Sequence, residues 1–508
     1  MDWWPQKTES WGNASVLNAD LSHPKLRAAA GGLSPWFLRV GGSQADEILY
    51  NFPRVEPGAW NATGTAEAED EEDAAIEAEC QRRRQKCLTS ERWDEVLDFA
   101  SSSGARVVFT LAYVRHTRAD ETRNDREHND VRDWDPANAR RLLEYTAGSR
   151  HSALGTVYGL ELGNELRHKG KVRDVPRMVR AYGELRRMVD EIWSRDGREG
   201  HPRPRLLGPA STGRGETSDL IARLGPLLDA ASYHKYHGGG RDEDLPRRAR
   251  HPSFYKHPAQ LSGPGEAVRD HMAPGSQELW VGEGAMAYNS GRVGVTDSFV
   301  GSLWHANLLG ALAKTSPLPH AVYCRQALVG GNYGLVSRET LDPNPDYWAS
   351  YLWKRLVGTR ALGPIRSPQR RDSAERSNVY TFGCCEEPGA DTVLVHAFCS
   401  AGESRPTSGG AGGGDVVFVA INISPDEGVR LEVDLGEGRT DYLLTPDEDG
   451  YESRAMLLNG ERMSIIEGGG RLPEPRGIER GRDERFLLMP PISIAFVVVH
   501  GAEVKVCD

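Results

Sequence analysis

The stretch GLELGNE, from Gly159 to Glu165, joins an apolar segment to an amide and a carboxylic acid. Mostly apolar residues at 157–162 form a run of strand length, which breaks at Gly163. Glu165 is therefore expected at the C-terminal edge of a strand. In a parallel α/β barrel that edge collects catalytic groups, because the strand fixes each side chain while the following loop leaves it open to a ligand. A solvated or salt-bridged loop glutamate is the alternative interpretation.

A second stretch of the same shape is ELWVGEGAMAY, Glu278 to Tyr288, in which a short apolar run leads through Gly282 into Glu283. Counted from Trp36, about eight short strands alternate with helical segments, and EILYNF, Glu47 to Phe52, is predicted as the second of them. One of these helices shows apolar residues at spacings of four and three between 178 and 192, which is typical of an amphipathic helix packed on another apolar surface. Repeated β–α units predict a closed (β/α)8 TIM barrel over residues 31–362.

The pattern changes beyond residue 362. Short alternating strands separated by turn residues predict a C-terminal antiparallel β-sandwich over 363–508. Residues 1–30 form an N-terminal segment that could add to this sandwich. The stretch at about 56–86 is rich in acids, has no apolar periodicity and is interpreted as an exposed loop. The basic segment 246–257 could meet an acidic polymer, although a solvated loop is the favoured interpretation.

Composition narrows the classes of function. The 508 residues carry a net charge of -11, which argues against a nucleic-acid or general polyanion binder. No apolar run reaches the length of a membrane helix. The chain opens with MDWWPQKTES, which is not a secretory leader, yet Asn13, Asn61 and Asn422 lie in glycosylation triplets. The seven cysteines show no zinc-site spacing, so no metal is expected.

Glu165 and Glu283 end the fourth and seventh predicted strands, on opposite sides of a barrel mouth. Retaining glycoside cleavage needs two carboxyls about 5–5.5 Å apart, one protonated to assist the leaving oxygen and one ionised to attack the anomeric carbon. Asn164 could hydrogen-bond the sugar's 2-hydroxyl. The negative charge of Glu283 and partial desolvation are expected to keep Glu165 protonated, which makes Glu165 the acid.

Several motifs resemble those of plant-type heparanase-like proteins of glycoside hydrolase family 79. They are GLELGNEL, ELWVGEGAMAYNSG, YCRQALVGGNYGL, NPDYWASYLWKRLVGT, the opening MDWWP with SWGNASVLNADL, and LSPWFLRVGGSQADEILY. The resemblance covers nearly the whole chain. It implies a barrel with a C-terminal β-sandwich, Glu165 as acid/base and Glu283 as nucleophile, in agreement with the interpretation above.

The resemblance also implies how a sugar is held. Asp46 resembles a ligand for ring hydroxyls, with a capping aspartate as the alternative, and Tyr236 resembles a tyrosine that hydrogen-bonds the nucleophile, with His234 beside it. Tyr288 and the stretch 330–333, with Gly331 and Tyr333, resemble the residues that receive the glucuronate carboxylate; a glycine allows close approach of the backbone to an anion. Gln326 lies on the same predicted strand and is expected to support these residues rather than to contact the sugar itself.

Among the cysteines, the resemblance implies a disulfide between Cys399 and Cys507. Cys80 and Cys87 are placed to pair locally. Cys324 is interpreted as a buried free thiol, and Cys384 and Cys385 are left unassigned.

These observations predict a retaining β-glucuronidase that needs no cofactor and acts on a glucuronate-containing glycan or glycoside. The resemblance implies a secreted, lysosomal or vacuolar protein. Two alternatives stay open: a retaining glycosidase of another sugar specificity, and a catalytically silent glycan-binding protein. Intact carboxyls at Glu165 and Glu283, with Asn164, argue against the silent protein.

Overall fold

The structure is a computed structural model that describes residues 1–508 except 4–10, 55–70, 84–85, 114–132, 169, 171, 173, 196, 257, 364–368, 372–378, 382–391, 403–413, 434, 467–469, 503 and 508. The chain forms two compact units. The first comprises Met1–Lys235, Ser262–Gly284 and His320–Gly330, and the second comprises Tyr236–Leu261, Ala285–Pro319 and Gly331–Asp508. Segments of the predicted barrel therefore belong to both units, and the N-terminal residues belong to the first.

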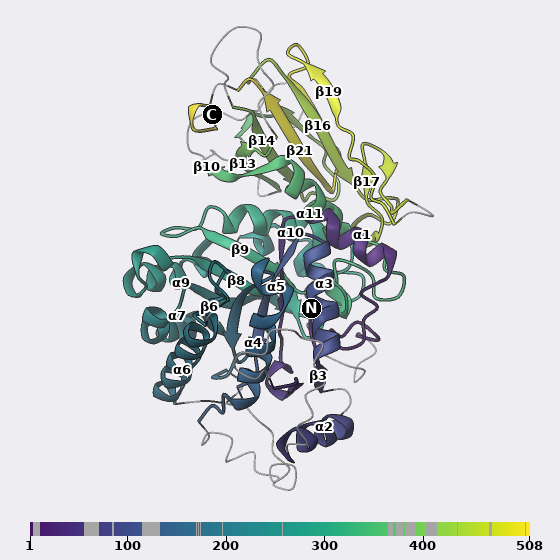
Figure 1. Ribbon diagram of the computed structural model, residues 1–508. Helices are drawn as coiled ribbons and strands as arrows, with labels where there is room; N and C mark the ends of the chain where they lie inside the picture. Colours follow the sequence, from purple (N-terminus) through teal and green to yellow (C-terminus); the bar gives the residue numbers. More distant parts are fainter. Residues whose placement is uncertain are drawn as a thin grey trace. The chain divides into compact units, whose positions relative to one another are not determined.

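A parallel sheet of seven strands carries the predicted β–α pattern (Figure 1). Its order is β1 (Trp36–Val40), β4 (Ala105–Leu111), β5 (Val157–Leu162), β6 (Arg205–Thr212), β7 (Ala230–Gly239), β8 (Leu279–Tyr288) and β9 (His320–Arg325). The registers run in parallel, as in Trp36 beside Ala105 and Leu279 beside His320. The end strands β1 and β9 approach each other, so the sheet curls into a near-barrel.

Helices alternate with these strands as the apolar spacing predicts. They are α1 (Pro24–Gly32), α2 (Glu71–Arg83), α3 (Ser90–Ser102), α4 (Ala137–Gly148), α5 (Arg150–Ala153), α6 (Val175–Trp193), α7 (Arg214–Leu224), α8 (Leu245–Ala249), α9 (Pro258–His271), α10 (Phe299–Leu312) and α11 (Pro345–Leu356). In α6 the residues from Met178 to Ile192 at spacings of four and three are buried, which confirms the predicted amphipathic face.

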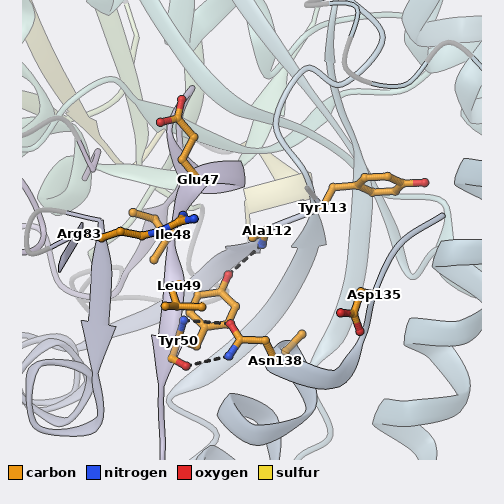
Figure 2. Close-up of a pocket in the computed structure, with 10 residues that line it drawn as sticks. Glu47, Ile48, Leu49, Tyr50, Arg83, Ala112, Tyr113, Asp135 and Asn138 are labelled. Atoms are coloured by element: carbon orange, nitrogen blue, oxygen red, sulfur yellow. Dashed lines mark hydrogen bonds between the residues drawn. The ribbon is translucent and has the colours of Figure 1, made fainter. Parts of the chain in front are cut away.

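The strand predicted second, at 47–52, does not join the parallel sheet. Only Leu49–Asn51 is a strand (β2), and it pairs with β3 (Cys87–Thr89), while β1 pairs directly with β4. Figure 2 shows the reason: the side-chain amide of Asn138 donates to Tyr50 O at 2.7 Å and accepts from Tyr50 N at 2.9 Å. This amide takes the place of a neighbouring strand.

The pocket beside β2 in Figure 2 is too small for a sugar. Its volume is about 30 Å³, room for about one water molecule. The Tyr50 hydroxyl accepts a hydrogen bond from Ala112 N at 2.8 Å, which fastens β2 to the residue after β4. The pocket therefore belongs to the packing of β2 and not to a substrate site.

The predicted acidic loop at 56–86 is wrong over its second half, which forms helix α2. Ile76 and Cys80, one turn apart, are buried against Leu49 and Cys87, and Cys80 forms a disulfide with Cys87. One apolar pair and one covalent link hold a helix whose other residues are mostly charged. The predicted local pairing of the two cysteines is confirmed, and residues 55–70 lie outside the described residues.

The second unit contains two further sheets, both built from the C-terminal residues. One comprises β10 (Val357–Leu362), β13 (Val393–Ser400), β14 (Val416–Asn422), β21 (Ser493–His500), β16 (Gly438–Thr445), β17 (Leu457–Leu458), β18 (Glu461–Arg462) and β19 (Ile478–Gly481); the other comprises β11 (Gln369–Arg371), β12 (Val379–Thr381), β15 (Val429–Glu432) and β20 (Phe486–Met489). The described pairings are antiparallel except β12 with β15.

Residues from both sheets share one apolar core. It includes Phe418 and Val497 from the larger sheet with Leu431 and Met489 from the smaller one. Such a core is what a β-sandwich requires, and the sandwich stays a prediction. Asn422 is fully buried and its amide donates to Glu427 O and Pro490 O, so it is not open to glycosylation in the folded chain.

Three predictions about the remaining cysteines have different outcomes. The disulfide between Cys399 and Cys507 is present, and Cys324 is a buried free thiol. Cys384 and Cys385 lie outside the described residues. Among the residues that the structure describes, no helix combines the length and apolar character needed to cross a bilayer.

Candidate active site

The carboxyl ends of the parallel strands bring the predicted catalytic residues together in the first unit. Glu165 follows β5, and its backbone adopts the left-handed conformation with φ 50°. Its N–H donates to the carbonyl of Ala210 at 2.9 Å, which ties it to β6. A left-handed glutamate is strained, and such strain persists only where surrounding contacts hold it.

The two predicted catalytic carboxylates and one imidazole form a tight group. Oxygen atoms of Glu165 and Glu283 and a ring nitrogen of His234 all lie within 4.8 Å of one another. The side chains of Glu165 and Glu283 are 11% and 10% exposed, so both reach solvent narrowly. His234 is fully buried and its Nδ1 lies 2.9 Å from Glu165 Oε1. His234, expected beside the substrate, therefore contacts the predicted acid/base directly.

Arg39, which the sequence reasoning missed, holds the predicted nucleophile. This residue lies on β1, and its Nη1 donates to Glu283 Oε2 at 2.9 Å while its Nη2 donates to Asn164 Oδ1 at 3.1 Å. Burial alone would lower the pKa of the guanidinium, but the negative charges of Glu161 and Glu283 raise it above its ordinary value. Arg39 is therefore a permanent positive charge beside Glu283.

Glu161 is a third carboxylate, buried beneath the first two and also missed from the sequence. It accepts from Arg39 Nε at 2.8 Å, from Thr110 Oγ1 at 2.8 Å and from Ser232 Oγ at 2.7 Å. Burial raises the pKa of Glu161, but Arg39 and His234, with the two hydroxyl donors, bring it below its ordinary value. The ion pair is thus charged although no solvent reaches Glu161.

Asp46 and Asn164 are both buried and bonded to the strand ends. Asp46, in the short helix η1 (Ala45–Glu47), accepts from Tyr113 N at 3.1 Å and from Asn164 N at 3.3 Å. The amide oxygen of Asn164 accepts from Arg39 and from Gly42 N, so the amide nitrogen points elsewhere. Asp46 thus ties η1 to the residues that follow β4 and β5, and its role toward ring hydroxyls stays a prediction.

Gln326 directly follows β9 and lies beside β8, the strand that carries Glu283. Its backbone N–H donates to Gly284 O at 2.9 Å, and its side-chain amide donates to Asp2 Oδ2 at 3.0 Å. Asp2 pairs with Gly41 in a parallel bridge. Burial and the charge of Glu283 raise the pKa of Asp2.

The residues expected to receive a carboxylate belong to the second unit. Tyr236 and Tyr288 meet edge to face at 6.3 Å between ring centroids, and Tyr288 is 52% exposed. Gly331 has φ 66°, and a β-carbon there would lie 2.6 Å from the ring of Tyr333. The glycine is therefore required by its own backbone and by the tyrosine ring.

One backbone N–H group of the stretch 330–333 already has a hydrogen-bond acceptor. The N–H of Asn332 donates to Ser290 O at 2.6 Å. The loop after β8 turns through three successive left-handed residues, Asn289, Ser290 and Gly291. Two of them are not glycine, which marks a strained turn of the kind found at ligand sites. The run Asn289-Ser290-Gly291 consists of turn-forming residue types, a signal that the sequence reasoning did not use.

The basic segment 246–257 pairs its arginines within the second unit. Arg247 and Arg248 bond Asp244 and Asp242, and Arg250 bonds Glu452. The segment is not the predicted loop, because α8 and a 3-10 helix at Pro252–Tyr255 cover most of it, and contact with an acidic polymer stays a prediction.

Glu165, His234 and Glu283 also have the ligand types of a divalent metal site. The Arg39 guanidinium already lies 2.9 Å from Glu283 Oε2 and is buried. A fixed positive charge at that distance opposes a divalent cation. The arrangement suits paired-carboxylate chemistry better than metal binding.

Comparisons with known proteins agree with the fold and the residue pattern. The family model for the N-terminal domain of glycosyl hydrolase family 79 matches residues 1–310. Heparanase-like protein 2 of Arabidopsis thaliana is 27% identical over all of this chain and 91% of its own, and a baicalin-beta-D-glucuronidase of Scutellaria baicalensis is 28% identical over 97% and 85%. A hyaluronoglucuronidase of Hirudo nipponia is 26% identical over 96% and 91%.

The similarity of this chain to solved structures shows the fold alone, because the sequence identities are low. A 4-O-alpha-L-rhamnosyl-beta-D-glucuronidase of Fusarium oxysporum superposes with a TM-score of 0.55 at 10% identity, over 94% of this chain and 92% of its own. An alpha-L-arabinofuranosidase of Thermotoga maritima gives 0.56 at 14% identity, over 96% and 92%. The family match over more than half of the chain settles the classification: this protein is a glycosyl hydrolase that belongs to family 79.

Proposed function

We propose that the protein is a retaining β-glucuronidase, with Glu283 as nucleophile and Glu165 as acid/base. The observation that carries the proposal is the spacing of the two carboxylates, whose oxygens lie within 4.8 Å. Retaining enzymes hold their carboxyls about 5–5.5 Å apart, whereas inverting enzymes leave about 6.5–9.5 Å for a water molecule. The close approach of one oxygen from each carboxylate agrees better with the retaining spacing, which favours a covalent intermediate.

In the first step Glu283 attacks the anomeric carbon while Glu165 protonates the departing oxygen. Arg39 supports this step because its Nη1 donates a hydrogen bond to Glu283 Oε2, which fixes that carboxylate oxygen. In the second step Glu165 removes a proton from water, which attacks the glycosyl-enzyme and releases Glu283. His234 Nδ1 is placed to hydrogen-bond Glu165 throughout. Asn164 is positioned by Arg39, which suits donation from its amide nitrogen to the 2-hydroxyl.

The choice of glucuronate rests on the relatives and on the residues that resemble carboxylate ligands. Two of the relatives are named as glucuronidases. We assign carboxylate recognition to Tyr288, Gly331 and Tyr333, and contact with the nucleophile to Tyr236. No cofactor is part of this mechanism. Two disulfides are consistent with an oxidising compartment, so we place the protein on the secretory, lysosomal or vacuolar route.

A comparison of two aryl glycosides tests the proposal. The wild-type chain is expected to hydrolyse an aryl β-glucuronide at least tenfold faster, in kcat/KM, than the matching β-glucoside, and to release the β-anomer first, as NMR detects. Equal rates would favour another sugar specificity. Tight binding of saccharides without hydrolysis would favour the silent glycan-binding protein.

Substitution of the acid/base separates the two steps. Glu165→Gln is expected to lose turnover of poor leaving groups by about 10²-fold or more, while an activated aryl glucuronide still forms the glycosyl-enzyme. Burst kinetics measure this difference. An equal loss on both kinds of substrate would contradict the assignment of Glu165.

A further inference from the structure

Directly beneath the catalytic pair, four polar side chains enter from four different strands. Arg39 comes from β1, Thr110 from β4, Glu161 from β5 and Ser232 from β7. Their hydrogen bonds measure 2.7–2.8 Å and converge on the carboxylate of Glu161. All four side chains are buried, and three guanidinium nitrogens of Arg39 have partners: Glu161, Glu283 and Asn164.

In this layer of buried side chains, the positive charge of Arg39 lies between the carboxylates of Glu161 and Glu283. Without Glu161, the whole positive charge of Arg39 would face Glu283, which would favour ionisation of the carboxylate but reduce its nucleophilicity. Without Arg39, Glu161 and Glu283 would be two buried negative charges in one apolar sheet, which is costly. With both present, one positive charge is shared between two carboxylates.

We propose that Arg39 and Glu161 are a positioning pair that sets the charge of the nucleophile Glu283. The inference rests on the proposed function and adds to it two residues and a division of labour. Arg39 orients Glu283 and favours its ionised form. Glu161 offsets part of the guanidinium charge. The carboxylate of Glu283 therefore keeps its charge and enough nucleophilicity to attack the anomeric carbon.

Other charged and titratable groups face the same layer and are the same in every variant, although burial moves the pKa of the Met1 amine and of Asp2 to about 6, so these two titrate within the range of the test. The groups are Asp46 from η1, Glu165 after β5, Tyr182 from α6, His234 from β7, Cys324 from β9 and the N-terminal residues Met1 and Asp2. Burial raises the pKa of Cys324 to about 12, so its thiol carries no charge over the working range.

The pH dependence of kcat/KM tests the pair, because its acidic limb reports ionisation of the nucleophile and its basic limb loss of the acid's proton. Glu161→Gln removes a negative charge, which makes both carboxyls easier to ionise, so both limbs are expected to move to lower pH. Arg39→Met removes a positive charge, so both limbs are expected to move to higher pH. Each shift is expected to be about 1–3 pH units.

Matched variants separate charge from geometry. Arg39→Lys keeps the charge, but its donors share one nitrogen and cannot reproduce bonds that three separate guanidinium nitrogens make, so kcat is expected to fall at least tenfold while both limbs of the pH profile stay in place. Thr110→Val removes one uncharged donor to Glu161 and is expected to leave both limbs unmoved. If these buried side chains only supported the fold, every variant would lose activity and neither limb of the pH profile would move.

Some substitutions at a buried ion pair can prevent folding, which circular dichroism would reveal. The double variant Arg39→Met with Glu161→Gln removes both charges together, and its acidic limb is expected to lie near that of wild type. A second readout is the pH dependence of trapping by a 2-fluoro glucuronide, which reports on the nucleophile at low residual activity.

The inference would be overturned if the two limbs of the pH profile of kcat/KM did not move in Glu161→Gln and Arg39→Met. It would also be overturned if they moved in the same direction in both variants. The proposed function would then stand if wild type hydrolyses the aryl glucuronide and Glu283→Gln does not. An inactive wild type would instead remove the proposed function.

Discussion

Gly282, directly before the proposed nucleophile, lacks a side chain because the buried ion pair occupies the space. A β-carbon there would lie 3.2 Å from Glu161 Oε1 and 3.6 Å from Arg39 Nε. Glu161 is held by three hydrogen bonds and has little freedom to move. Gly282→Ala is therefore expected to destabilise the fold by about 1–3 kcal/mol, as overpacking does, and to lower kcat.

Hydrogen exchange in β8, which reports on the first unit locally, and steady-state kinetics check this expectation. Gly275→Ala is the control, because a β-carbon at Gly275 meets nothing within 4 Å. Unchanged kinetics in Gly282→Ala would mean that Glu161 shifts without effect on Glu283.

At the residue level the sequence identified the carboxylates but not the groups that hold them. Glu165 and Glu283 were predictable because each follows an apolar run and a glycine. Arg39 and Glu161 interrupt such runs from inside, and a charge inside a buried parallel strand is itself a signal. What the sequence could not supply is their pairing, since 122 positions separate them.

The amide of Asn138 fixes the position of strand β2, which sequence reasoning placed in the barrel. Replacement by alanine leaves the N–H and C=O of Tyr50 without these partners, and Tyr50 is 1% exposed. Asn138→Ala is expected to cost about 1–3 kcal/mol of unfolding free energy. Asn138→Asp, which keeps an acceptor for Tyr50 N but not the donor to Tyr50 O, is expected to fall between alanine and wild type. Equal stabilities for all three would show that water replaces the amide.

Element boundaries were predictable where one apolar face dominates, as in α6. Helix α2 was missed because its burial depends on Ile76 and a disulfide rather than on a repeating stripe. The strand pattern at 47–52 was recognised, but its partner strand was not, because a short apolar run does not encode which neighbour satisfies its backbone.

For the molecule as a whole, the order of elements was predictable and the division into units was not. A parallel β–α region followed by antiparallel strands follows from periodicity alone. The two compact units instead combine segments that lie far apart in the sequence. Such a division depends on contacts of long sequence separation, for which local patterns carry no information.

The two disulfides differ in loop length, which predicts different contributions to stability. Cys399 and Cys507 are 108 positions apart, whereas Cys80 and Cys87 are seven apart. In the chain-entropy account a loop of about 100 residues contributes about 4.7 kcal/mol and a much shorter one about half of that. Replacing both Cys399 and Cys507 by serine is therefore expected to cost about 2 kcal/mol more than the same change at Cys80 and Cys87.

Because the chain has two units, one unfolding curve does not report both contributions. Hydrogen exchange resolves them: the first change is expected to lower protection across β13, β14 and β21, and the second only in α2 and β3. Serine at both positions of a pair avoids leaving a lone reactive thiol. Equal losses of protection from the two changes would mean that local packing, rather than loop closure, determines what each disulfide contributes.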